Sequence, residues 1–129
     1  MVVELNHTIV GARDKAESAA FLTEILGLDP PVDAGHFLVV ELSNGVSLDF
    51  ADVANDVDIP SQHYAFLVSE AEFDEVHARV LEREITFWPH PRIADAGQIN
   101  HNDGGRGFYF MDPSGHFLEV LTRPYGSGA

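Results

Sequence analysis

The sequence predicts an α+β fold, built as one domain over residues 1–129 in which a pattern of strands and a helix occurs twice. Three observations support this fold class. The length suits one domain, 45% of the residues are hydrophobic without a long apolar run, and two similar stretches follow one another along the chain. We expect one module over about residues 1–55 and a second over about residues 60–125.

The first half begins with the β-rich segment VELNHTIV and continues into a helix expected from about residue 14 to residue 26. Asp14 suits the N-cap position, because its side chain can accept hydrogen bonds from the first turn, and Gly27 suits the end of the helix. The runs HFLVVELS and GVSLDF follow, joined by Asn44 and Gly45, a pair typical of tight hairpin turns. This half is therefore predicted as β-α-β-β.

The second half repeats the same order, beginning with QHYAFLVS. Ser69 and Glu72 form the S-x-x-E pattern of a capping box, which predicts the start of a second helix. GRGFYFMD and HFLEVLTR are expected to be strands joined by a turn at residues 112–115. Apolar residues at helical spacing form the expected inner stripe of this helix: Phe73, Val76, His77, Val80 and Leu81.

The composition excludes several classes of function. Seven Lys and Arg against 21 Asp and Glu give a formal charge of −14, which would repel nucleic acid, so we expect no nucleic-acid partner. The absence of cysteine excludes thiolate metal sites, thiol nucleophiles and disulfides. The N-terminus lacks a signal-peptide pattern and no run reaches the roughly 18 apolar residues of a membrane span, so we expect no membrane partner and a cytoplasmic location.

Three polar residues, His7, His63 and Glu119, share strand faces with apolar neighbours two positions away. The largely apolar strands imply sheets covered on both sides, with helices outside and a closed or half-closed barrel inside. A carboxylate in that setting is costly unless it is paired, hydrogen-bonded or bound to a metal, and two His with one carboxylate suit Zn, Mn, Fe, Co or Ni. Each residue alone is also consistent with a structural role in which it satisfies buried hydrogen bonds.

Four segments carry a resemblance to a known family: Leu5-Asn6-His7, the helix end FLTEILGL, His63, and GGRGFYFMDPSGHFLEV from residue 104 to residue 120. Together they resemble the vicinal oxygen chelate superfamily, which contains glyoxalase I, fosfomycin-resistance enzymes, extradiol dioxygenases and bleomycin-binding proteins. The resemblance covers nearly the whole chain. It implies paired βαβββ modules that form a half-open barrel and, in small members, a homodimer with a shared active site.

The resemblance also implies roles for individual residues. It places the metal ligands at His7, His63 and Glu119, which would hold a divalent ion such as Zn, Ni, Mn, Fe or Co. Asp49 matches a further glutamate ligand of glyoxalase I but is one methylene shorter, so a hydrogen-bonded carboxylate near the metal is an equal alternative. Glu119 or Asp49 is expected to act as the catalytic base.

Residues that could contact a small-molecule substrate come from the loop 93–106 and from aromatic positions. The loop is polar and directly precedes a strand of the expected cavity, as loops that close over ligands often do. A solvated loop and ordinary core packing are the alternative interpretations. The candidates are Asn100, His101, Asn102 and Arg106 in the loop, and Phe50, Trp88 and Tyr109 among the aromatic residues.

Three functions remain open at this stage. The first is a metal-dependent, glyoxalase-like lyase or isomerase, although Gly11 stands where glyoxalase I has the arginine that engages glutathione. The second is a one-domain dioxygenase of the extradiol type, and the third is a non-catalytic dimer that binds an antibiotic, as bleomycin-binding proteins do. The fosfomycin-resistance pattern needs a cluster of cationic residues, for which seven Lys and Arg give little support.

Overall fold

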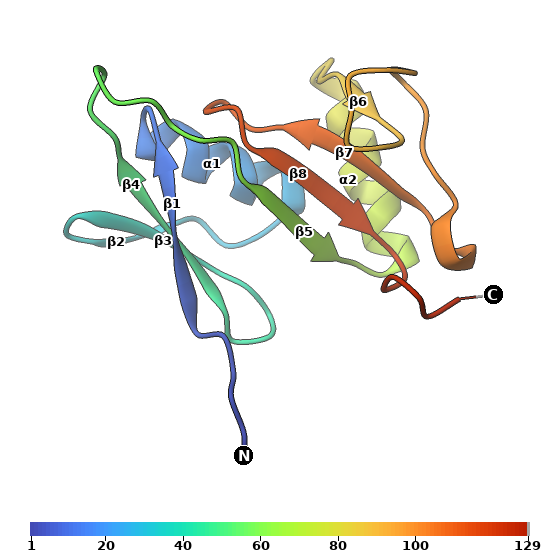
Figure 1. Ribbon diagram of the computed structural model, residues 1–129, viewed down its shortest axis with the longest axis horizontal. Coiled ribbons are helices and arrows are strands. Elements are labelled where there is room, and N and C mark those ends of the chain that lie inside the picture. The colour runs from blue at the N-terminus through green and yellow to red at the C-terminus, as the bar shows by residue number, and fades with distance from the viewer. Residues whose placement is uncertain (129) are drawn as a thin grey trace. The chain divides into compact units, whose positions relative to one another are not determined.

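The computed structural model describes residues 1–128, which form two compact modules, Met1–Pro60 and a second one starting at Ser61 (Figure 1). Each module contains one α-helix and one open four-stranded sheet, so the predicted α+β class with paired modules is confirmed. No helix in residues 1–128 combines the length and the apolar character needed to cross a membrane.

The first module has the order βαβββ. Its elements are β1 (His7–Ala12), α1 (Lys15–Leu26), β2 (Val32–Ala34), β3 (Phe37–Glu41) and β4 (Ser47–Asp52). The sheet order is β1-β4-β3-β2, with β1 parallel to β4 and the other pairs antiparallel. The β-α-β-β prediction from the residues lacked β2, because its three residues are too few to show a strand pattern.

The second module repeats this topology. Its elements are β5 (His63–Leu67), α2 (Glu70–Glu82), β6 (Phe87–Trp88), the 3-10 turn η1 (Asn102–Gly104), β7 (Gly107–Met111) and β8 (Phe117–Leu121). The sheet order is β5-β8-β7-β6, again with one parallel pair, β5 and β8, at one edge. The two-residue strand β6 lies between α2 and the loop 93–106, where the sequence predicted no strand.

The strand registers show how closely the modules correspond. In the first module His7 pairs with Ser47, and Asp49 follows two residues later on β4. In the second module His63 pairs with Phe117, and Glu119 follows two residues later on β8. Asp49 is therefore the positional counterpart of Glu119, which supports an internal duplication of one βαβββ unit.

Side chains at the ends of both helices act as the sequence predicted. The Asp14 side chain accepts hydrogen bonds from the backbone of Ala16 and Glu17, and Gly27 ends α1 in the left-handed conformation at φ 69°. At α2, Ser69 and Glu72 form both hydrogen bonds of a capping box, each 3.1 Å long. Hydrogen bonds from the Ser69 side chain and backbone to the Glu72 carboxylate lower the pKa of Glu72, because they stabilise its ionised form.

Ser69→Ala is expected to lower the free energy of unfolding by about 1 kcal/mol, because the Glu72 backbone N–H then loses its acceptor. Chemical denaturation followed by circular dichroism measures this change. Ser69→Asp, which keeps an oxygen acceptor, serves as the control and should stay close to the wild type. Equal stability of the alanine variant and the wild type would contradict the capping role.

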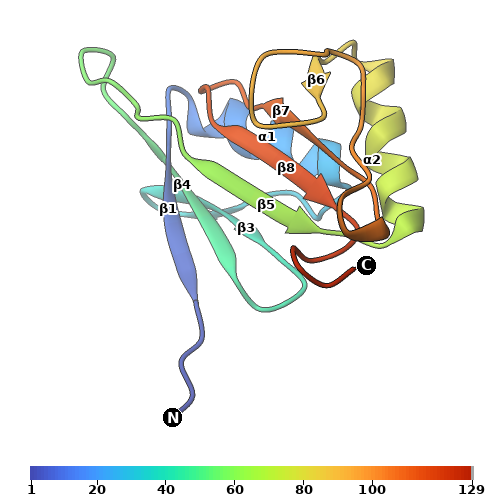
Figure 2. The ribbon, with the colours of Figure 1, turned by 45° about the vertical axis from the view of Figure 1, so that its right-hand side comes forward.

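Each helix covers the apolar face of its own sheet. In the second module α2 packs against the β7 side of the sheet (Figure 2), where the rings of Phe73 and Phe108 are 5.4 Å apart. Phe73, Val76 and Val80 are buried, as the predicted stripe requires. The prediction is wrong for Leu81, which is 55% exposed because it lies at the edge of the stripe near the helix end.

The opposite face of the second sheet is open at its edge. Along β5, Tyr64 and Phe66 point toward the covered side, whereas His63, Ala65 and Leu67 are exposed. The expectation that both faces are covered therefore does not hold within this module. The opposite face carries His63 at its exposed edge and, on the neighbouring central strand β8, the buried Glu119.

Candidate metal centre

Glu119 is a buried carboxylate at the centre of the second sheet, with only 1% of its surface exposed. Its Oε1 atom lies 3.0 Å from Nε2 of His63, and its Oε2 atom accepts a hydrogen bond from the hydroxyl of Tyr125. His63 reaches Glu119 because the two residues are diagonal neighbours on adjacent parallel strands. The sequence-predicted pair of ligands in this module is thus brought into direct contact.

The hydrogen bond at Nδ1 of His63 determines the protonation of Nε2, the ring nitrogen that faces Glu119. Its Nδ1 atom lies 3.3 Å from the carbonyl oxygen of Phe117, which can only accept, so Nδ1 carries the proton. In the neutral ring Nε2 then holds a lone pair that faces the lone pairs of Glu119 Oε1. Two such atoms 3.0 Å apart repel each other unless a proton or a metal cation lies between them. This is the tautomer that a metal-ligating histidine needs.

Two tyrosines extend the network. The hydroxyls of Tyr109 and Tyr125 are 2.7 Å apart, and the Tyr109 ring stacks against His63 with centroids 5.6 Å apart. Burial raises the pKa of Tyr109, and burial together with the hydrogen bond to Glu119 raises the pKa of Tyr125. Both phenols are therefore protonated at neutral pH, so Tyr109 donates to Tyr125, which in turn donates to Glu119.

Tyr125 comes from the C-terminal tail, defined here as residues 122–128, and sequence reasoning missed it. The Asp103 side chain accepts hydrogen bonds from the backbone of Gly126, at 3.1 Å, and of Gly128, at 3.4 Å. The start of the tail is fixed by Thr122, whose Oγ1 accepts a hydrogen bond from the Arg106 backbone at 2.8 Å. These contacts hold the tail so that Tyr125 reaches Glu119.

The corresponding positions of the first module carry a different arrangement. His7 is exposed, and its Nδ1 donates to the side-chain oxygen of Asn6 at 2.7 Å, which leaves the lone pair on Nε2. Asp49 is half-buried and accepts a hydrogen bond from Ser47 at 2.9 Å. Asp49 has the same place in the strand register as Glu119 but a shorter side chain. Its hydrogen-bond partner is Ser47 on the same strand. The proposed fourth-ligand and base roles of Asp49 stay predictions.

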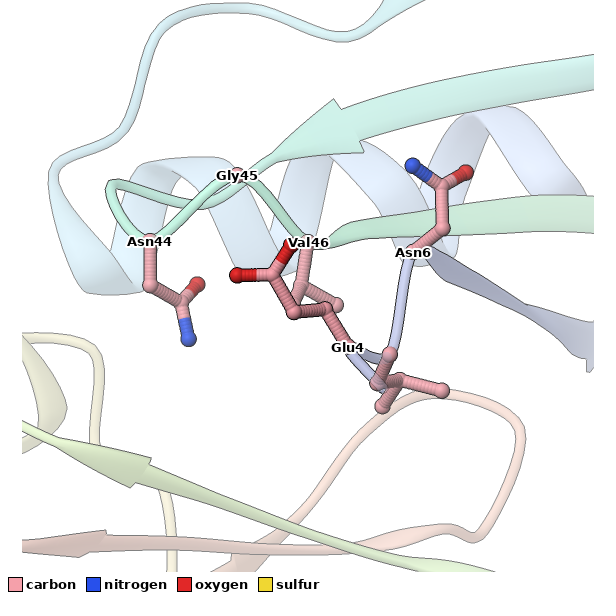
Figure 3. Close-up of a pocket in the computed structure, with 6 residues that line it drawn as sticks. Glu4, Asn6, Asn44, Gly45 and Val46 are labelled. Atoms are coloured by element: carbon pink, nitrogen blue, oxygen red, sulfur yellow. The ribbon is translucent and has the colours of Figure 1, made fainter. Parts of the chain in front are cut away.

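A hollow of about 560 Å³ lies beside the start of β1, lined by Glu4, Leu5, Asn6 and residues 44–46 of the β3–β4 turn. Figure 3 shows Glu4 reaching toward Val46, with Asn44 on one side and Asn6 on the other. The lining contains one carboxylate and two amides and no histidine. The hollow therefore offers fewer metal-ligating groups than the pair formed by His63 and Glu119.

The structure buries the substrate candidates Phe50 and Asn100. Phe50 is 2% exposed and lies on the face of β4 opposite to Asp49, so it is a core residue of the first module. The buried Asn100 amide donates to the Pro89 carbonyl and accepts from the Asn102 backbone, so both its nitrogen and its oxygen have partners within the protein. His101 and Asn102 are exposed, and their contact with a substrate stays a prediction.

Arg106 is engaged with α2 rather than directed into a cavity. Its guanidinium contacts the carboxylates of Glu70 and Asp74 at 2.8 and 2.9 Å and lies over the Phe73 ring, 4.3 Å from the centroid. The Asp74 and Glu70 carboxylates raise the pKa of Arg106, which stays charged. Of the aromatic candidates, Tyr109 belongs to the hydrogen-bond network of Glu119. Trp88 is buried on strand β6, where it is the register partner of Tyr109 on β7.

The donor set of the second module fits a divalent metal. Metal–nitrogen and metal–oxygen bonds are about 2.0–2.2 Å long, so two ligands of one ion lie roughly 3 Å apart, which is the separation found between His63 and Glu119. The His7 ring has the matching tautomer, with Nε2 available. Within residues 1–128, no three His, Asp or Glu side chains lie close enough together to hold a metal ion.

The chain is similar to several known proteins. A solved structure described as oxidase ChaP-H2 is 56% identical, with the whole of both chains covered and a TM-score of 0.95. Glutathione transferase FosA from Serratia marcescens is 30% identical over 93% of this chain and 81% of its own length. Metallothiol transferase FosB from Lysinibacillus sphaericus (strain C3-41) is 27% identical over 94% of this chain and 83% of its own length. Residues 4–120 match the family model, so the chain belongs to the Glyoxalase/Bleomycin resistance protein/Dioxygenase superfamily.

Proposed function

We propose that this protein is a metal-dependent oxidase that acts on a small molecule carrying two neighbouring oxygen atoms. The observation that carries the proposal is the buried Glu119 carboxylate 3.0 Å from Nε2 of His63, an arrangement that a cation between the two atoms stabilises. His7 is the third proposed ligand, because its tautomer presents Nε2 in the same way.

The comparisons support an enzyme of this family but do not favour the glyoxalase reaction. Identity of 56% over the full length with an oxidase, against 30% with a glutathione transferase, makes oxidation the better-supported reaction class. The glyoxalase-like lyase, which the sequence placed first, becomes an alternative. The one-domain dioxygenase is a second candidate, because it too uses dioxygen and differs only in where the oxygen atoms end.

The residues of the second module suit such a reaction. A divalent ion held by these ligands would supply a Lewis acid for two substrate oxygens and, as iron or manganese, a route for electrons to dioxygen. The Tyr109 hydroxyl donates to Tyr125, so it helps to hold the hydroxyl that contacts Oε2 of Glu119. Glu119 can take a proton from the substrate. In the overall reaction the substrate loses two electrons and two protons, and dioxygen accepts them as hydrogen peroxide.

Oxygen uptake tests the reaction class. Protein loaded with Fe(II) or Mn(II) is mixed with catechols in an oxygen electrode, and hydrogen peroxide is assayed in parallel. We expect metal-dependent uptake with one peroxide formed per dioxygen consumed, and loss of uptake in Glu119→Gln but not in Glu82→Gln, an exposed carboxylate on α2. Incorporation of labelled oxygen into the product without peroxide would identify a dioxygenase instead. Isomerisation of the methylglyoxal–glutathione adduct without oxygen uptake would favour the glyoxalase alternative.

A further inference from the structure

We propose that the C-terminal tail is part of the metal centre and that Tyr125 is a positioning residue, which holds Oε2 of Glu119 so that only Oε1 faces the metal. This inference rests on the proposed metal site. It assigns a role to a segment that lies beyond the last strand and outside the family match, which ends at residue 120.

The two oxygens of Glu119 have different partners, and this difference is the starting point. Oε1 faces Nε2 of His63 at 3.0 Å, whereas Oε2 is held by the Tyr125 hydroxyl. A carboxylate can bind a metal through one oxygen or through both. A hydrogen bond to one oxygen favours binding through the other and leaves more coordination positions for a substrate with two oxygens.

The tail is docked by specific contacts rather than lying loosely on the surface. Asp103 has a left-handed backbone at φ 56° and accepts hydrogen bonds from two backbone N–H groups of the tail. Gly128 lies against the Asp103 backbone so closely that an added Cβ would overlap the carbonyl group. The Arg123 side chain also donates to the Ser127 carbonyl at 3.2 Å, which closes the tail on itself.

The position of the Tyr125 side chain supports a role at the carboxylate. The residue is 59% exposed, yet its hydroxyl ends at a carboxylate that is 1% exposed and at the hydroxyl of Tyr109. The ring therefore bridges the surface and the buried site. A tyrosine that only packed against the protein would bury its ring and leave its hydroxyl in water.

Binding of Co(II) tests the inference without an activity assay. The dissociation constant is measured by competition with a chelator, and the visible absorption spectrum is recorded at saturation. We expect Tyr125→Phe to weaken Co(II) binding by about 10- to 100-fold and to change the spectrum, because the freed Oε2 atom alters the ligand set. Tyr64→Phe removes a hydroxyl from the opposite face of β5 and serves as the matched control.

Variants of Asp103 separate positioning by the tail from a purely local effect of the ring. Asp103→Gly tolerates the left-handed backbone but removes the acceptor, so it should reproduce the effects of Tyr125→Phe. Asp103→Asn keeps an acceptor oxygen and should bind Co(II) as the wild type does. Wild-type affinity and spectrum in Tyr125→Phe, with binding lost in Glu119→Gln, would overturn the inference. Wild-type binding in Glu119→Gln would instead overturn the metal site itself.

Discussion

Replacing Glu119 by Gln is expected to lower the affinity for a first-row divalent metal by more than about 100-fold, because the site loses the buried negative charge next to His63. Glutamine keeps the size of the side chain and an oxygen near Tyr125. His63→Ala removes the other ligand of the pair and should lose the metal to a similar extent. Elemental analysis of untagged protein and chelator competition measure both effects.

The stability of the metal-free protein distinguishes a metal ligand from a structural carboxylate. A buried carboxylate that serves only to pair with His63 stabilises the fold, so Glu119→Gln would then cost about 1–3 kcal/mol in the absence of metal. If Glu119 serves to bind a metal, its buried negative charge destabilises the fold when the ion is absent. The Glu119→Gln variant should then be at least as stable as the wild type without metal. Loss of stability with unchanged metal content would contradict the metal site. His90→Ala, in an exposed loop, is the control for histidine replacement.

Much of the fold follows from local signals in the sequence. The capping pattern of Ser69 and Glu72 and the N-cap of Asp14 act within one helical turn, so no distant residue can override them easily. Residues 112–115 form the expected turn, in which the Asp112 carbonyl accepts from Gly115 at 3.1 Å. The short strands β2 and β6 could not be predicted, because pairing with a neighbouring strand, rather than their own residues, defines them.

The contact between His63 and Glu119 was predictable because it depends on strands whose apolar pattern is clear. His63 and Glu119 stood out as polar residues on such strands, and the parallel pairing of β5 with β8 brings them together. The partners of Arg106 and Asn100 were not predictable, because a polar loop residue can face solvent, a ligand or its own protein. Tyr125 lies in a tail whose sequence has no periodicity. Its position depends on contacts with distant residues, those of Asp103 with the tail backbone and that of its hydroxyl with Glu119.

The site of His7 leads to a prediction about assembly. The ligand pair belongs to the second module and His7 to the first, and we propose that the protein is a homodimer in which each metal is held by His63 and Glu119 of one subunit and by His7 of the partner subunit. Members of the superfamily act on small molecules and commonly form dimers. Under this arrangement, His7→Ala and Glu119→Gln affect the same metal through different subunits.

Mixing the two variants therefore restores intact sites. In a heterodimer of a His7→Ala chain and a Glu119→Gln chain, one site carries both replacements and the other carries none. After unfolding and joint refolding at equal concentrations, half of the dimers are mixed, so about a quarter of the sites should again bind metal and support oxygen uptake. Each variant refolded alone is the control. The contrary result is a mixed dimer, seen by native mass spectrometry, in which neither metal binding nor oxygen uptake recovers. The three ligands then do not meet across the subunit interface, and a site within one chain explains the data better.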